Sequence, residues 1–218
     1  MSRLPESLHE LQTIFDRWSE SIQNHKDMEK RIFFIGKEMP ALLLNRQLFK
    51  KILTNIVKGR NYPDARQATM FTNEFVLYIN NRRLFSVRLY IYEPGQYSPI
   101  HDHNSWGVYG CVLNTIEVVR YRREDDETRP EYARLQEIER PILQPGETAS
   151  VLPLNDGIHR AGNPAGNTSV MLSVYGTPIR RLFVNEYDHI QNRVSKLYPP
   201  RLNKKMLASQ ALETMENP

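Results

Sequence analysis

The sequence predicts a mainly β protein, a sandwich or barrel preceded by helices, and two observations support this fold class. Up to about residue 58, apolar residues recur every three or four positions, the period of amphipathic helices. From about residue 70 the period falls toward two, and short apolar stretches alternate with Pro, Gly and Asn turns. Many short strands joined in this way are typical of a β-sandwich or a barrel. We therefore expect a helical segment (1–60), a barrel (61–190) and a C-terminal extension (191–218).

Three helices are expected in the first part of the chain. Their apolar periodicity covers residues 4–24, about 26–38 and 45–58. We expect Pro40 to end the second helix, because proline lacks the N–H that a helix interior requires, and Gly59 to end the third. Each helix carries an apolar face, so the segment is expected to pack on the barrel.

Short strands are expected through most of the remaining chain. They are Phe75–Ile79, Phe85–Tyr92, Val108–Leu113, Thr115–Tyr121, Leu135–Ile138, Glu147–Leu152, Ser169–Tyr175 and Arg180–Val184. The charged stretch from residue 122 to 134 is expected to form a loop or an exposed hairpin end. From Asn203 onward we expect a short helix or a frayed end.

Composition narrows the class of protein further. Of 218 residues, 40% are hydrophobic, an ordinary share for a globular protein with a core. The single cysteine, Cys111, excludes an internal disulfide and a Cys-rich zinc site, and it fits a reducing compartment. The N-terminus lacks the apolar core of a signal peptide, and no run approaches about 18 apolar residues. We therefore expect a cytoplasmic protein with no membrane partner.

The charge distribution bears on nucleic acid as a partner. The net charge is +4, from 29 basic and 25 acidic residues. The basic residues form short, scattered groups, which are typical of solvated faces and not of a nucleic-acid surface. We expect no nucleic-acid partner, and the sequence leaves the oligomeric state open.

The stretch from Pro94 to Gly107 carries the strongest chemical signal. His101 and His103 follow an apolar, β-rich run and a Pro-Gly turn. Residues two apart in a strand point to the same face, so both imidazoles would aim at one point while Asp102 points away. Neutral imidazole is the commonest protein ligand for Fe, Zn, Cu and Ni. The pair therefore predicts a metal site, which requires a third ligand.

His159 is the candidate for that third ligand. It follows an expected strand, Pro153 and a turn at Gly157. A turn between two strands of a small barrel can bring a side chain back beside the first pair. His159 alone leaves a structural role open, and its surroundings strengthen the case because they match those of the first stretch.

Together the two stretches resemble the two cupin motifs. The first motif is a Gly, five residues and His-x-His, and the stretch Gly95–His103 fits it. The second contains Pro, Gly and His with an Asn four residues after the His, and Pro153–Asn163 fits it loosely. Cupins usually supply a Glu ligand four or five residues after the second His, where this chain has Gly107 and Val108. The run Ser-Pro-Ile-His-Asp-His-Asn-Ser-Trp-Gly is similar to the cysteine dioxygenase family, particularly its bacterial thiol dioxygenase relatives, over roughly residues 60–190.

The resemblance implies a cupin double-stranded β-helix, a jelly-roll barrel, with N-terminal helices. It also implies a non-haem Fe(II) thiol dioxygenase in which His101, His103 and His159 hold the iron. The implied substrates are O2 and a small carboxylate-bearing thiol, of the cysteine or mercaptopropionate type, which is oxidised to its sulfinate. Three histidines would also suit zinc, and the resemblance favours iron.

Tyr175 matches the family's Tyr in a Ser-x-His-x-Tyr pattern, whose hydroxyl reaches the active site. Met171 and Ser173 stand where the family has Ser and His. Ser173 would therefore orient Tyr175 through a water, or the substrate differs from the usual one. Animal members join a Cys to this Tyr, and the matching position here is Val108, so we expect no crosslink. Cys111 is expected to be a buried strand residue.

A substrate carboxylate requires a fixed cation, ideally a guanidinium. The Tyr-x-Arg stretch of the cysteine-using enzymes is absent between residues 72 and 78. Some mercaptopropionate-using relatives place an Arg after the Tyr-Gly strand, which makes Arg180 and Arg181 candidates, and Arg88 is a rival. Trp106 is expected to wall the pocket or to pack.

Two alternatives stay open beside the dioxygenase. One is another metal-dependent cupin enzyme, an isomerase or a dioxygenase acting on carbon, which the missing Tyr-x-Arg and Ser173 leave possible. The other is a non-catalytic, ligand-binding cupin, against which the three intact histidines speak.

Overall fold

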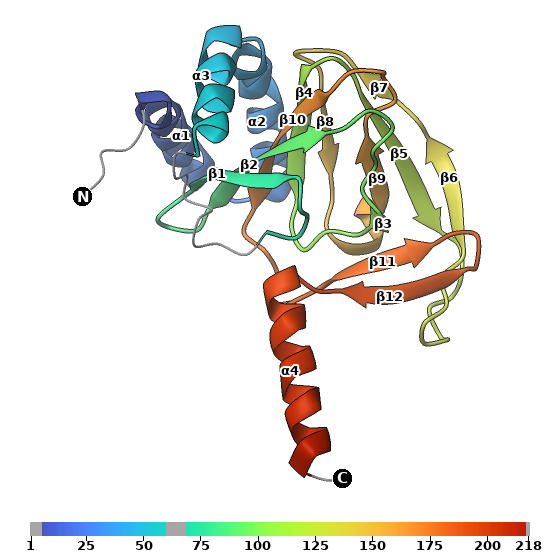
Figure 1. Cartoon of the computed structure of the whole chain (residues 1–218). Helices are drawn as coiled ribbons and strands as arrows, with labels where there is room; N and C mark the ends of the chain where they lie inside the picture. The colour runs from blue at the N-terminus through green and yellow to red at the C-terminus, as the bar shows by residue number, and fades with distance from the viewer. Residues whose placement is uncertain (1–5, 60–68, 217–218) are drawn as a thin grey trace.

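The computed structural model describes residues 6–59 and 69–216. Figure 1 shows three N-terminal helices on one side of a β-barrel and a C-terminal helix that projects away from it. The expected first residues of the first helix and the expected boundary at residues 60–61 lie outside the described residues. None of the described helices is long and apolar enough to cross a membrane.

The three helices form close to where the apolar periodicity predicts them. They are α1 (Glu6–Asn24), α2 (Met28–Leu43) and α3 (Arg46–Val57). Side chains cap two of the N-termini: Asp27 accepts from Lys30 N at 2.7 Å, and Asn45 accepts from Leu48 N at 3.1 Å. Such caps satisfy backbone donors that have no partner inside the helix.

The prediction that Pro40 ends the second helix was wrong. Pro40 lies inside α2, which continues to Leu43. Leu42 and Leu43 are buried in the core beneath the helices. Burying two leucine side chains stabilises by roughly 1.5–3 kcal/mol each, which offsets the roughly 3 kcal/mol that a helix-interior proline costs.

The strands form two antiparallel sheets, with most neighbours distant in the sequence. One sheet has the order β1 (Glu74–Ile79), β2 (Phe85–Tyr92), β10 (Ser169–Gly176), β4 (Gly107–Leu113), β8 (Thr148–Val151). The other has the order β12 (Arg193–Leu197), β11 (Val184–Asp188), β3 (Ile100–His101), β9 (His159–Gly162), β5 (Ile116–Arg123), β6 (Leu135–Glu139), and β7 (Ile142–Leu143) pairs with β5. This arrangement is the double-stranded β-helix of the cupin fold, so the predicted fold class is confirmed.

The two faces of the first sheet have different roles. In β10, Val170, Leu172 and Val174 belong to the same buried cluster as the apolar residues of the helices. The alternate residues Met171 and Tyr175 belong to a second cluster, inside the barrel. One set of strands therefore packs on the helices with one face and lines the barrel interior with the other.

The C-terminal part differs from expectation in two ways. Arg180–Val184 was predicted as a strand, but only Val184 is in β11, and Leu182 is 71% exposed. β11 and β12 form a hairpin across the expected boundary at residue 190. The helix α4 (Pro200–Glu216) is longer than the short helix that was expected from Asn203. The division of the chain into three parts stays a prediction.

Replacing Leu172 by Ala tests the interface between the first sheet and the helices. Leu172 is fully buried there, so we expect L172A to lower the free energy of unfolding by about 2–5 kcal/mol. The matched control is I138A, because Ile138 is a strand residue that is 51% exposed, and its cost should stay below about 1 kcal/mol. Urea unfolding followed by circular dichroism measures both; equal costs would contradict the assignment of this interface.

Candidate metal centre

Three histidines meet where strands β3 and β9 pair. His101 ends β3, His159 begins β9, and the two residues lie directly opposite each other in the antiparallel ladder. His159 follows the 3₁₀ turn Leu154–Gly157 and is itself a strand residue. His103 lies beyond the end of β3, so strand alternation does not position it, contrary to expectation.

The three imidazoles nevertheless converge. The ring centroids lie 4.8 Å apart for His101 and His103, 4.8 Å for His103 and His159, and 5.2 Å for His101 and His159. One ring nitrogen of each lies within 4.8 Å of the others, and all three side chains are buried. This buried group could hold a metal ion.

The protonation of the group suits a metal. Burial lowers the pKa of His101, although its bond to the Pro99 carbonyl opposes the shift. Burial and the neighbouring imidazoles hold the pKa values of His103 and His159 well below the usual range. His101 Nδ1 lies 2.8 Å from Pro99 O, so a neutral ring donates there and leaves Nε2 as a free ligand atom. Among the described residues, the buried His103 Nε2 has no hydrogen-bond partner, as expected for a ligand atom.

No carboxylate of a described residue joins this group. Gly107 occupies one of the two positions where cupins usually supply Glu, and a Cβ there would lie 2.8 Å from Tyr175 Cδ1. The ring of Tyr175 therefore fills the space into which a side chain at residue 107 would project. Tyr175 also stacks on His103, with ring centroids 5.5 Å apart and planes inclined by 23°.

Asp102 lies between His101 and His103 in the sequence, and its side chain anchors the segment that carries these two histidines. Its buried carboxylate accepts from both Arg181 Nη atoms at 2.5 and 3.0 Å, and from Asn185 N and Nδ2 at 2.8 and 2.9 Å. Arg181 Nε also donates to Asn104 Oδ1 at 2.6 Å. These bonds tie the short strand β3 to the chain around β11.

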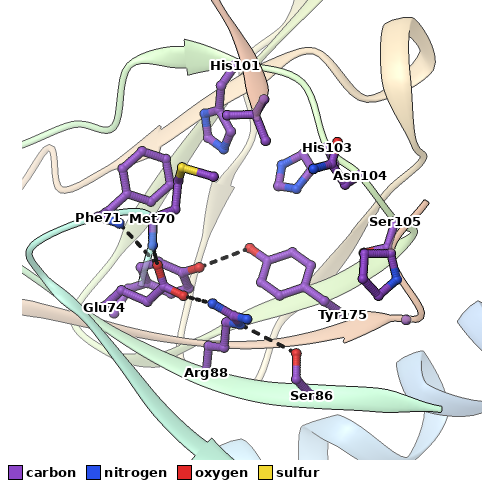
Figure 2. A pocket seen from close by; sticks show the side chains of 14 residues that line it. Met70, Phe71, Glu74, Ser86, Arg88, His101, His103, Asn104, Ser105 and Tyr175 are labelled. Atoms are coloured by element: carbon purple, nitrogen blue, oxygen red, sulfur yellow. Dashed lines mark hydrogen bonds and ion pairs between the residues drawn. The ribbon is translucent and has the colours of Figure 1, made fainter. Parts of the chain in front are cut away.

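A small pocket opens beside His101 and His103. Its volume is about 200 Å³. Figure 2 shows the two imidazoles on one side of it, Arg88 and Glu74 on the other, and Tyr175 between them. The lining residues are Met70, Phe71, Glu74, Ser86, Arg88, Tyr90, His101, His103, Asn104, Ser105, Tyr175, Gly176, Pro178 and Val184.

Two tyrosine hydroxyls meet in this pocket. Tyr90 and Tyr175 have their hydroxyl oxygens 3.5 Å apart. Burial raises the pKa of each phenol, most strongly that of Tyr90, so both stay neutral and can donate a proton in a hydrogen bond at neutral pH. Tyr90 was not predicted, although it shares a strand face with Arg88 in the printed sequence.

Of the other predicted site residues, some lie at the pocket and some lie away from it. Arg88 lines the pocket, and Ser173 is buried directly opposite it on β10. Arg180 is exposed, and Arg181 is bound to Asp102 outside the pocket lining. Trp106 is buried in the core beneath the helices instead of lining the pocket. Sequence reasoning missed Glu74, a lone acidic residue in an apolar strand.

Removing one imidazole tests the metal centre. We expect purified protein to bind about one Fe(II) or Zn(II) per chain and H103A to lose most of this metal, because two imidazoles rarely hold a divalent ion. Elemental analysis after dialysis against buffer measures it. H9A is the control, since His9 is an exposed residue of α1. Equal metal contents in H103A and the parent protein would rule out this centre.

Removing Arg181 tests the support beneath the histidines. R181A would leave the fully buried Asp102 carboxylate without its cation, so we expect a loss of about 3–5 kcal/mol in the free energy of unfolding. The neighbouring exposed residue gives a matched control, and R180A should stay within about 0.5 kcal/mol of the parent. Urea unfolding of both variants decides; similar stabilities would show that the Asp102 pair is dispensable.

No protein-family model matches the chain. Similar solved structures include a cupin 2 conserved barrel domain protein from Salinispora arenicola, at 16% identity over 54% of this chain and 86% of that one, with a TM-score of 0.37. A cupin 2 domain-containing protein from Halorhodospira halophila is 17% identical over 56% of this chain and 74% of that one, with a TM-score of 0.40. A sugar phosphate isomerase from a cupin superfamily, from Silicibacter pomeroyi, is 16% identical over 59% of this chain and 78% of that one, with a TM-score of 0.36. By its own strand order the chain has the cupin fold, with three buried histidines that could hold a metal ion.

Proposed function

We propose that the chain is a non-haem Fe(II) thiol dioxygenase that oxidises a small carboxylate-bearing thiol to its sulfinate. The observation that carries the proposal is a group of three buried histidines that no carboxylate of a described residue joins, two of which, His101 and His103, line a small pocket that holds a guanidinium. Such a group leaves a divalent ion with its full charge and with open coordination positions.

The choice of iron rests on the resemblance described above. Zinc also accepts three histidines. The run from Ser98 to Gly107, with His101 and His103 inside it, is similar to the corresponding run in cysteine dioxygenases. When bound, Fe(II) would lower the pKa of a substrate thiol and supply the redox chemistry that O2 requires.

The pocket supports a small anionic substrate. Its volume of about 200 Å³ is below the range of roughly 300–1,000 Å³ that drug-sized ligands occupy. Among the described residues, Arg88 is the arginine that lines it, whereas Arg181 is engaged by Asp102 and Arg180 is exposed. We therefore assign the substrate carboxylate to Arg88, on the side of the pocket opposite the imidazoles.

The side chains around the pocket would position the reacting sulfur. Arg88 binds the carboxylate, so the thiol end points toward His101 and His103. The neutral hydroxyl of Tyr175 donates a hydrogen bond into the space between them, and Tyr90 holds that hydroxyl in place. The overall change is a thiol plus O2 giving a sulfinic acid, which loses its proton in water; both oxygen atoms join the sulfur and no other reductant is consumed.

Oxygen uptake with a thiol panel tests the proposal. We expect the Fe(II)-loaded protein to consume O2 with cysteine or mercaptopropionate and to form the sulfinate in equal amount, measured by an oxygen electrode and mass spectrometry. R88A should lower kcat/KM for these thiols by about tenfold or more, since it removes a charged hydrogen bond to the carboxylate. R180A should leave kcat/KM unchanged, as an exposed neighbour.

Two results would contradict the dioxygenase. Iron-loaded protein that consumes no O2 with any thiol of the panel would leave a cupin of another enzymatic class or a ligand-binding cupin. Oxygen uptake that ends in a disulfide without sulfinate would show thiol oxidation outside the proposed site.

A further inference from the structure

We infer that Glu74 is a positioning residue of this pocket, holding Arg88 in place so that one edge of the guanidinium faces the anionic end of the ligand. The inference rests on the proposed function in that the ligand carries an anionic group. It assigns a role to Glu74, which is not one of the candidate metal ligands.

The contacts of Glu74 make it a fixed counter-charge. Its side chain has no exposure to solvent, and Oε1 forms an ion pair with Arg88 Nη1. Oε2 accepts from the backbone N–H groups of Met70 at 2.8 Å and Phe71 at 3.2 Å. A buried carboxylate must be paired and hydrogen-bonded, and here both oxygens have protein partners. Glu74 is therefore engaged by the protein on both oxygens.

The contacts of Arg88 leave donors for a ligand. The guanidinium offers five N–H donors in a rigid plane. Nη1 is committed to Glu74, and Nε lies 3.4 Å from Ser86 Oγ, a weak contact. Among the described residues, Nη2 has no hydrogen-bond partner. Both residues line the pocket, but the Arg88 side chain is 25% exposed while that of Glu74 is 0% exposed, so the cation is the more accessible member of the pair.

The sheet register fixes this pair. Val76 is the partner of Arg88 across β1 and β2, and Glu74 is the partner of Tyr90. Glu74 and Arg88 are therefore diagonal neighbours on the same face, within reach of long side chains. Glu74 also holds the Met70–Phe71 segment, and the ring of Phe71 packs edge-on against His101 with centroids 5.1 Å apart. One carboxylate thus links the cation, the pocket wall and the histidine group.

The E74Q substitution tests this role, because Gln keeps the size of Glu and removes its charge. In the Fe(II) enzyme we expect the KM for mercaptopropionate to rise about tenfold, while the KM for mercaptopropanol, a neutral thiol of matched length, changes less than about twofold. The kcat for either thiol should change less than the KM for mercaptopropionate. E38Q is the matched control, since Glu38 forms a surface ion pair with Arg17, and it should shift neither KM.

A second readout is independent of oxidation. In Co(II)-loaded protein, the visible absorption of the metal reports thiol binding, and titration with the two thiols gives two dissociation constants. We expect E74Q to weaken mercaptopropionate about tenfold, to leave mercaptopropanol unchanged and to retain the metal. If E74Q does not fold, the E74Q/R88Q double variant replaces the pair by two neutral amides, and it should bind mercaptopropionate no more weakly than R88Q.

The outcomes separate the two proposals. An unchanged preference for mercaptopropionate in E74Q, an equal weakening of both thiols, or a further loss in E74Q/R88Q relative to R88Q would overturn the role of Glu74. Titrations that show the Glu74-dependent preference, in a protein whose iron form oxidises no thiol, would support Glu74 and refute the dioxygenase.

Discussion

The pairing of strands β3 and β9 is the constraint on which the site depends, because it places His101 opposite His159. β3 has only two residues, so its own ladder cannot hold this register. The Asp102 carboxylate supplies the missing support through four hydrogen bonds to Arg181 and Asn185. A buried carboxylate that loses these donors costs several kcal/mol of stability. The fold is therefore stable only while Asp102 keeps its partners, and this arrangement also holds the segment with His101 and His103 in place.

Stability and chemistry come from opposite faces of the same strands. In β2, Val87 and Leu89 pack in the core under the helices, while Arg88 and Tyr90 line the pocket. The period of two in a strand makes this division unavoidable once one face is buried, and a register slip of one residue would exchange the faces. The helical layer thus fixes which side chains can reach the pocket, although none of the described residues that line the pocket belongs to a helix.

The sequence predicted the parts of the site that depend on short-range spacing. The His101–His103 pair could be predicted because its members lie only two positions apart. The turn at Gly157 could be predicted for the same reason, since it lies two residues before His159. Glu74 was missed because its partner Arg88 lies fourteen positions away, and their contact depends on a register that includes an irregularity between Val76 and Tyr78. Arg180 and Arg181 could not be told apart by pattern, since one side chain reaches Asp102 and its neighbour does not.

Two ion pairs, each without net charge, flank the histidines. They determine how strongly an added charge would interact with the histidine group. Arg181 with Asp102 lies behind them, and Arg88 with Glu74 lies across the pocket. An unpaired charge at either place would act strongly on the buried imidazoles, because the effective dielectric constant inside a protein is well below that of water. Since each pair carries no net charge, a divalent ion would be the largest local charge in the site. A ligand bearing a thiolate and a carboxylate would then neutralise that ion, with Arg88 directing the carboxylate by the geometry of its hydrogen bonds and not by excess charge.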